Sequence, residues 1–158
     1  MKNINFLFLF AFSLALCAGW KCTQPVEIIS VHYEEGHYDD ILVKNFPTTK
    51  RGKIAWWKKN RAMLKEKYGI PHPDENGIIS VAIWDFAKGY KEMPKRDSSR
   101  NTKITNLVCF DKMQVRENCI EKNWLMDYIN SSSGHHYLYI QGGVWQEMPD
   151  GSFKRVGY

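Results

Sequence analysis

The chain has 158 residues, a formal net charge of +5 and 44% hydrophobic residues. Beyond an apolar N-terminal segment, the remaining length is enough for one domain and short for two. The positive excess is too small to indicate nucleic acid as a partner, and we expect no cofactor and no bound metal.

The first feature along the chain is a near-continuous apolar run over residues 4–20, which Lys2 precedes and Lys21 follows. Its length lies at the short end of the range of about 17–25 residues that spans a bilayer. Lys2 favours an N-terminus inside the cell and a body outside it. We therefore predict a signal anchor over residues 1–22 and a single exported α+β domain over residues 23–158. The alternatives are a cleaved signal peptide and a lipid attached to Cys17.

A hairpin follows the apolar run. Residues 26–32 and 41–46 are β-prone, and a polar turn around Gly36 separates them. Further along, residues 78–86 are apolar on both faces of a strand, which indicates a central position in a sheet. Residues 93–103 are polar and predict an exposed loop. The remaining strands are expected at 107–110, 124–129, 137–140, 144–148 and 152–156, the last two forming a hairpin.

A helix is predicted from Thr49 to Tyr68, with Thr48 or Thr49 as its N-cap and Gly69 just beyond its end. Its apolar side chains keep to one face. Eight basic side chains lie along it against a single acid, Glu66: Lys50, Arg51, Lys53, Lys58, Lys59, Arg61, Lys65 and Lys67. Hairpins in succession plus one helix predict an α+β fold, a small antiparallel sheet backed by one long basic amphipathic helix.

The cysteines divide by position. Cys109 and Cys119 lie ten positions apart in the body, and in an oxidising compartment they are expected to form a disulfide. A redox or zinc pair is the alternative, but the spacing lacks a CxxC motif and no further body cysteine completes a zinc site. Cys17 lies in the apolar run, and the state of Cys22 is left open.

Two clusters carry residues that could support metal or hydrolytic chemistry. Residues 32–40 hold His32, Glu34, Glu35, His37, Asp39 and Asp40 around a turn, where solvated charges are the more ordinary reading. His135 and His136 follow serines 131–133, and Asp127 could complete a Ser-His-Asp set. No strained turn presents any of these serines, and a triad is recognised by geometry, so we expect no catalytic residues here.

A series of short segments along the body matches one known family: Pro25–Ile28, Val31-His32, Leu42–Pro47, Gly52–Ile54, Trp56-Trp57, Met63–Lys65, Lys67-Tyr68, Ile70-Pro71, Trp84–Phe86, Gly89-Tyr90, Cys109–Asp111 and Asn118–Asn123. In these segments the chain resembles the enterobacterial putative membrane proteins, a family without assigned function. The resemblance runs from about Pro25 to Asn123 and is vague beyond. It implies a single-span protein of the bacterial inner membrane with its body in the periplasm, and it supplies no catalytic residues.

These observations together predict a non-enzymatic interaction protein that is attached to the cytoplasmic membrane. The basic helix would bind an acidic protein partner or an anionic surface. An immunity protein against a toxin that acts in the periplasm is one alternative, and a metal-dependent hydrolase using His32, His37 or His135 is another. The residues expected to form the binding surface are Lys53, Trp56, Lys58, Lys59, Arg61 and Lys65.

Overall fold

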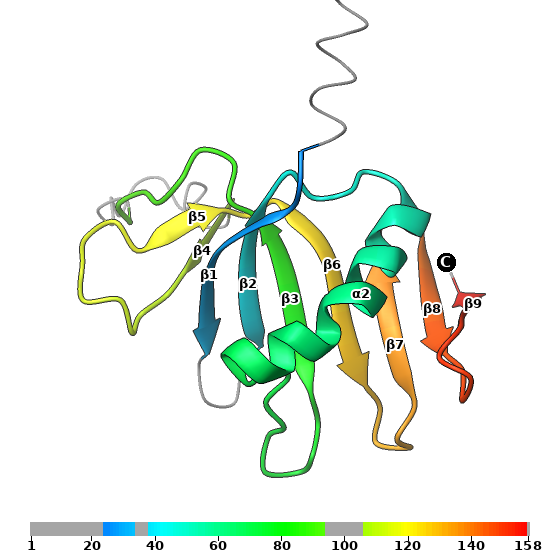
Figure 1. The fold of residues 1–158 in the computed structure, drawn as a ribbon. Helices are drawn as coiled ribbons and strands as arrows, with labels where there is room; N and C mark the ends of the chain where they lie inside the picture. The colour runs from blue at the N-terminus through cyan, green and yellow to red at the C-terminus, as the bar shows by residue number, and fades with distance from the viewer. Residues whose placement is uncertain (1–23, 34–37, 94–105, 158) are drawn as a thin grey trace, which may run out of the picture.

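The computed structural model describes residues 24–33, 38–93 and 106–157, and the expected anchor, with Cys17 and Cys22, lies outside these ranges (Figure 1). Within them, no helix has both the length and the apolar character needed to cross a bilayer.

The main sheet has seven strands in the order β1-β2-β3-β6-β7-β8-β9. Their bounds are β1 Glu27–Tyr33, β2 Asp39–Lys44, β3 Ser80–Asp85, β6 Trp124–Asn130, β7 His136–Ile140, β8 Gly143–Glu147 and β9 Phe153–Gly157. The predicted β1–β2 hairpin is confirmed as an antiparallel pair. The predicted strand around residues 78–86 is confirmed as β3, which lies third in the sheet with β2 and β6 beside it.

The expectation of a small, wholly antiparallel sheet is wrong in two respects. The sheet is large, and β2 pairs with β3 in parallel. The reason lies in the connection, since helix α2 (Lys50–Tyr68) joins these two strands. A helix between two neighbouring strands carries the chain back to the end where the first strand began, so the strands run in the same direction.

Helix α2 begins and ends where its local sequence predicts. The Thr49 side chain accepts a hydrogen bond from the Gly52 amide at 3.0 Å and so caps the first turn. Gly69 adopts a left-handed conformation (φ 73°) that glycine tolerates best, and its amide donates to the carbonyls of Leu64 and Lys65.

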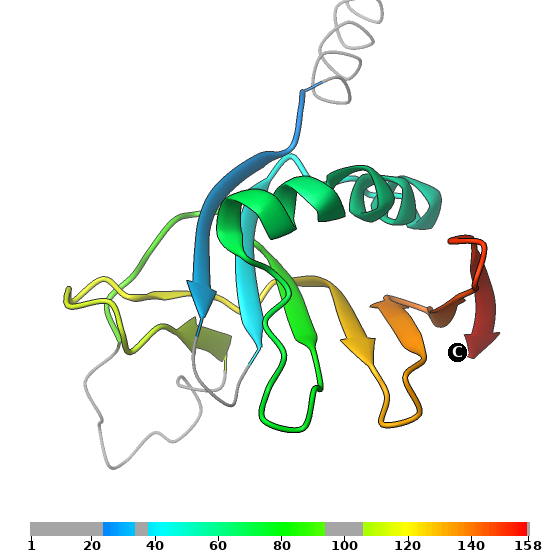
Figure 2. The same ribbon diagram turned by 60° about the horizontal axis from the view of Figure 1, so that its bottom comes forward.

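The helix packs on one face of the sheet (Figures 1 and 2). Trp57 and Leu64 are its central apolar contacts, and they meet the inward side chains of β2, β3, β6, β7 and β8. The Trp57 ring lies 4.4 Å from the ring of Tyr128, centroid to centroid. The buried members of this cluster are Ile41, Val43, Trp57, Leu64, Ile70, Val81, Ile83, Met126, Tyr128, Leu138, Ile140 and Trp145.

The opposite face of the sheet is covered at its β1–β3 end by a second, two-stranded sheet, β4 (Leu107–Cys109) with β5 (Cys119–Glu121). Phe110 and Ile120 pack there with Leu42, Ala82 and Trp84. The predicted disulfide is confirmed: Cys109 and Cys119 are register partners on β4 and β5, and the bond joins them.

The main sheet is open, with β1 at one edge and β9 at the other. The register of β1 against β2 shifts between Ile28 and Ser30, which marks a bulge in this edge strand. At the other edge, β9 carries the exposed basic side chains of Lys154 and Arg155.

Candidate functional site

The outward face of α2 is an uncompensated basic surface. Its exposed side chains include Arg51, Lys58, Lys59, Lys65 and Lys67, and none of these five forms an ion pair with another described residue. Positive charges at this density lower the free energy of an anion that lies against the helix. We call these five side chains the basic face of α2.

Other basic residues of α2 are engaged with the sheet. Arg61 forms an ion pair with Glu147 of β8, although its side chain stays 42% exposed. The Lys50 ammonium lies 5.6 Å from the ring of Trp145 and donates to the Gly142 carbonyl at 3.4 Å. These contacts hold α2 against β8, whereas the five side chains of the basic face are exposed to solvent.

Lys53, which we expected on the exposed surface, is instead buried between α2 and the sheet. Its ammonium donates to the Leu125 carbonyl at 2.7 Å and lies over the ring of Phe46, and burial lowers its pKa. Lys53 therefore does not contribute to the outward face. Trp56 is half-buried, with its ring edge against Phe46 at 4.9 Å, so only part of its surface can meet a partner.

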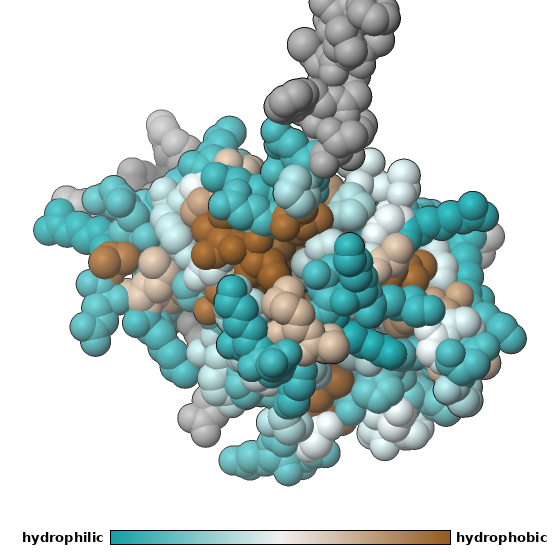
Figure 3. All heavy atoms as spheres, in the orientation of Figure 1, coloured by the Kyte–Doolittle hydropathy of each residue, from teal (hydrophilic) through white to brown (hydrophobic). Residues whose placement is uncertain are grey.

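The chain enters the domain on the side that α2 covers. In both ribbon views the first described residues lie at the top, and Figure 2 places them on the same side of the sheet as the helix. An apolar area lies below this point and beside hydrophilic side chains (Figure 3). Partly buried side chains pack against the core that α2 covers: Val26 just before β1, Ile28 of β1, and Trp56 and Met63 of α2. Helix α2 and the point where the N-terminal segment joins the domain thus lie on the same side of the sheet (Figure 2).

A cavity of about 590 Å³ opens between α2 and the ends of β6–β8. Tyr128 and Glu147 are among the residues that line it, and the Tyr128 hydroxyl donates a hydrogen bond to the Glu147 carboxylate at 2.9 Å. Burial and the negative charge of Glu147 raise the pKa of Tyr128. The ring of His136 stacks on Tyr128, and its Nδ1 is buried without a hydrogen-bond partner among the described residues.

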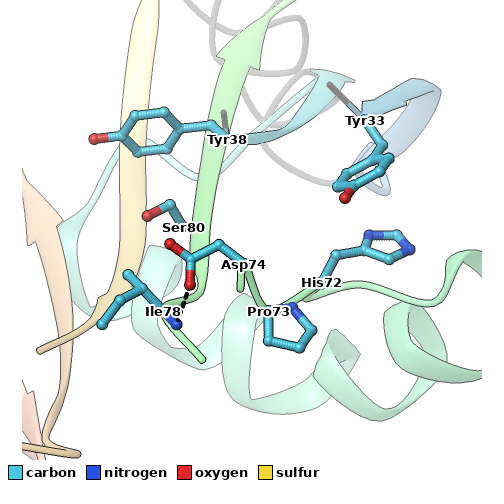
Figure 4. A pocket seen from close by; sticks show the side chains of 7 residues that line it. All are labelled: Tyr33, Tyr38, His72, Pro73, Asp74, Ile78 and Ser80. Atoms are coloured by element: carbon cyan, nitrogen blue, oxygen red, sulfur yellow. Dashed lines mark hydrogen bonds between the residues drawn. The ribbon is translucent and has the colours of Figure 1, made fainter. Parts of the chain in front are cut away.

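A smaller pocket of about 120 Å³ lies at the end of the sheet where β1 stops and β3 begins (Figure 4). His72 lines it, and the buried carboxylate of Asp39 accepts from the His72 amide at 2.7 Å and contacts its Nδ1 at 2.8 Å. The His72 Nε2 lies close to Gly69, so this nitrogen faces the end of α2. Asp39 and His72 thereby fix the chain that leaves the helix. The lining residues are Tyr33, Tyr38, His72, Pro73, Asp74, Ile78 and Ser80.

The residues considered for metal or hydrolytic chemistry are dispersed. His32 stacks on Phe110 at 3.9 Å and hydrogen-bonds Tyr90 at 2.8 Å, and Glu34, Glu35 and His37 lie outside the described residues. Across the described part of the chain, no three His, Cys, Asp or Glu side chains are grouped as a metal would need.

The Ser-His-Asp set is not assembled either. Ser131 bonds Ser133 at 2.7 Å, and the Ser131 amide donates to the His135 carbonyl within the β6–β7 turn. Asp127 lies four positions before Ser131, within β6 and opposite Tyr139 in register, and accepts a hydrogen bond from Trp124 Nε1 at 2.6 Å.

The carboxyl group of Asp127 has an unusual environment that sequence reasoning did not find. Burial raises its pKa from 3.8 to about 6, and the Trp124 hydrogen bond only partly opposes this. Because the folded pKa is the higher one, the folded state binds the proton more tightly than the unfolded chain does. The unfolding free energy therefore falls as pH rises from about 4 to 6, and at neutral pH the charged carboxylate destabilises the fold.

Replacing Asp127 by asparagine is expected to raise the unfolding free energy by about 2 kcal/mol at pH 8 and to leave it unchanged near pH 3.5. The full pKa difference corresponds to about 3 kcal/mol, which residual exposure reduces. Asparagine keeps an acceptor for Trp124. Urea unfolding at both pH values measures the difference, with Glu75→Gln in an exposed turn as the control. Equal unfolding free energies for Asp127→Asn and the unsubstituted chain at pH 8 would contradict the assignment.

Comparison with known proteins returns one family. A family model described as enterobacterial putative membrane protein matches residues 2–157. The match includes the apolar run and the C-terminal strands, so it extends well beyond the segment from Pro25 to Asn123 that carries the resemblance in the sequence. No curated protein and no solved structure matches the chain.

Proposed function

We propose that this chain, which belongs to the enterobacterial putative membrane protein family, is a membrane-tethered, non-enzymatic interaction protein whose basic face binds the anionic surface of the same membrane. The observation that carries the proposal is the uncompensated charge of Arg51, Lys58, Lys59, Lys65 and Lys67 on the side of the domain where the chain enters.

The length of the tether supports contact between the basic face and lipid. Trp20, the last residue of the apolar run, lies four positions before Gln24, so the chain between them reaches at most about 14 Å. A domain held this close cannot move far from the headgroups. Each lysine near an anionic lipid surface contributes about 1 kcal/mol of attraction, which salt weakens over a Debye length of about 10 Å.

The apolar flank of α2 fits the same orientation. Trp56 lies beside the basic face and is half-buried, with its ring against Phe46, which follows β2. Tryptophan is favoured at the level of lipid headgroups, where one part of the ring contacts apolar groups and the other stays wet. With the basic face on the membrane, the opposite face of the sheet points into the periplasm.

The test places the full chain in lipid nanodiscs that contain gadolinium-labelled headgroups, with or without one-third anionic lipid. Amide signals of α2 should broaden in the anionic discs and recover in 0.5 M salt. The triple variant Lys58→Gln, Lys59→Gln, Lys65→Gln should lower the docked-to-undocked ratio about a hundredfold, because three lysines contribute about 3 kcal/mol.

The matched control removes the same charge elsewhere, with glutamine at the exposed Lys112, Lys122 and Lys154. In anionic discs, the α2 amide signals of this control should broaden as much as those of the unsubstituted chain. Undiminished broadening of α2 in the triple variant would show that the basic face does not hold the domain against lipid. The amide signals of α2 could instead stay sharp in anionic discs and broaden when a soluble acidic protein bearing the label is added. That result would favour a protein partner.

A further inference from the structure

The face of the sheet opposite α2 carries a second candidate site. The β4–β5 sheet covers this face over β1–β3 but not over β6 and β7. Three large aromatic side chains around this uncovered part are exposed to solvent: Trp124 of β6 by 36%, Tyr139 of β7 by 39%, and Tyr38, just before β2, by 40%. Figure 4 shows Tyr38 pointing across β3 towards β6.

The register of the strands places the carboxylates of Asp40 and Asp127 close to these rings. Asp40 pairs with Ala82 of β3, Ala82 pairs with Asp127 of β6, and Asp127 pairs with Tyr139 of β7. Asp40 and Asp127 therefore flank a small residue on one face, with backbones about 10 Å apart. An indole holds each carboxylate, because Trp84 Nε1 donates to Asp40 and Trp124 Nε1 donates to Asp127, both at 2.6 Å.

The charge of Asp127 is not balanced by any basic side chain of the described residues. Trp124 is its one hydrogen-bond donor among the described residues, and no basic side chain of those residues forms an ion pair with it. Burial raises the pKa of Tyr38, and the negative charges of Asp127 and Asp40 raise it further. A carboxylate that destabilises the fold at neutral pH and lies beside exposed rings is typical of a binding site.

We propose that Asp127, Trp124, Tyr38 and Tyr139 bind an arginine or lysine side chain of a partner protein. The partner's cation supplies the charge that Asp127 lacks and forms a charge-assisted hydrogen bond with it. The electron-rich faces of the three rings attract the same cation. A neutral sugar could stack on the rings, but it would leave the carboxylate unbalanced, so the charge favours the cation.

The site is separate from the basic face, which lies on the other side of the sheet. Its occupancy does not require lipid docking, and docking would leave it facing the periplasm. The titratable groups that face Asp127 among the described residues are Asp40, Tyr38 and Tyr139. The pKa of Asp127 is about 6, so the affinity for arginine should rise about tenfold from pH 5 to pH 7.5 as this carboxyl group becomes charged.

The experiment uses the full chain in polyoxyethylene detergent micelles, which offer neither charge nor sugar. The probe is the peptide acetyl-Gly-Arg-Gly-amide, and the readout is the indole N–H resonance of Trp124 in NMR spectra. We expect a saturating shift at millimolar peptide, a dissociation constant at least tenfold higher in Asp127→Asn, and about threefold higher in Tyr139→Ala. Glu75→Gln should bind as the unsubstituted chain does.

Two further probes make the outcome decisive. The same peptide with citrulline, which keeps the shape of arginine without its charge, should give no saturating shift. A neutral oligosaccharide, chitotetraose, should also leave the Trp124 signal in place. The proposal is overturned if the citrulline peptide or the sugar shifts Trp124 as strongly as arginine does, if Asp127→Asn binds arginine unchanged, or if 50 mM arginine peptide produces no shift.

Discussion

Replacing Trp57 by alanine is expected to lower the free energy of unfolding by about 3–5 kcal/mol. Trp57 is 1% exposed and is the largest fully buried side chain among the described residues, between α2 and the sheet. Alanine would remove the contact with Tyr128 and leave a cavity that the rigid strands cannot close. Urea denaturation followed by circular dichroism measures the loss.

Two companion variants separate packing from the indole N–H. Trp57→Phe keeps a ring in the core and removes a buried N–H that has no partner among the described residues, so its unfolding free energy should stay within about 1 kcal/mol of the unsubstituted chain. Trp56→Ala, at a half-buried neighbour, should lose about half as much as Trp57→Ala or less. If Trp56→Ala lowered the unfolding free energy as much as Trp57→Ala does, Trp57 would not be the central contact between the helix and the core.

Loss of the disulfide is the second large effect. The double variant Cys109→Ser, Cys119→Ser should lower the unfolding free energy by about 3 kcal/mol, because a closed loop of ten residues restricts the unfolded chain by about that amount. The hairpin that the bond closes places Phe110 and Ile120 over Trp84, so its loosening also exposes apolar surface.

Urea unfolding of the oxidised chain with and without a phosphine reductant gives the same comparison without substitution. Cys17→Ser with Cys22→Ser is the control, since neither residue belongs to the described domain, and the unfolding free energy should not change. Identical unfolding free energies in the oxidised and reduced chains would show that the bond does not stabilise the fold.

The local features of the fold could be predicted from the sequence. Thr49 and Gly69 determine the ends of α2 through bonds to residues within five positions, so the helix was predictable almost to the residue. The β1–β2 pairing depends on a short connection and was predictable for the same reason. The disulfide between Cys109 and Cys119 was predictable from their spacing together with the expectation of an oxidising compartment.

Features that depend on distant partners were not predictable. The two apolar faces of β3 indicate cover on both sides, but they do not reveal that β2 lies beside it in parallel with α2 as the connection. Asp127 gains its environment from Trp124, Ala82 and Tyr139, and two of these lie on other strands. No local signal identifies such a carboxylate.

The misplacement of Lys53 is different, because its position was visible in the sequence. Lys53 precedes Trp57 by four positions and Leu64 by eleven, which places all three on one stripe of a helix. Lysine as a residue type predicts an exposed position, whereas the helical spacing of Lys53 predicts a buried one. Its long aliphatic stem can cross an apolar contact while the ammonium reaches the Leu125 carbonyl.

The open ends of the sheet have a consequence for how copies of the chain behave beside one another. Edge strands such as β1 and β9 are templates on which a second molecule could extend the sheet. The two edges resist this differently: the irregular step after Ile28 breaks the flat ladder of β1, whereas Lys154 and Arg155 bring like charges together on any approach of β9 to another β9. Protection against strand-to-strand polymerisation is therefore geometric at one edge and electrostatic at the other, and raised ionic strength weakens only the second.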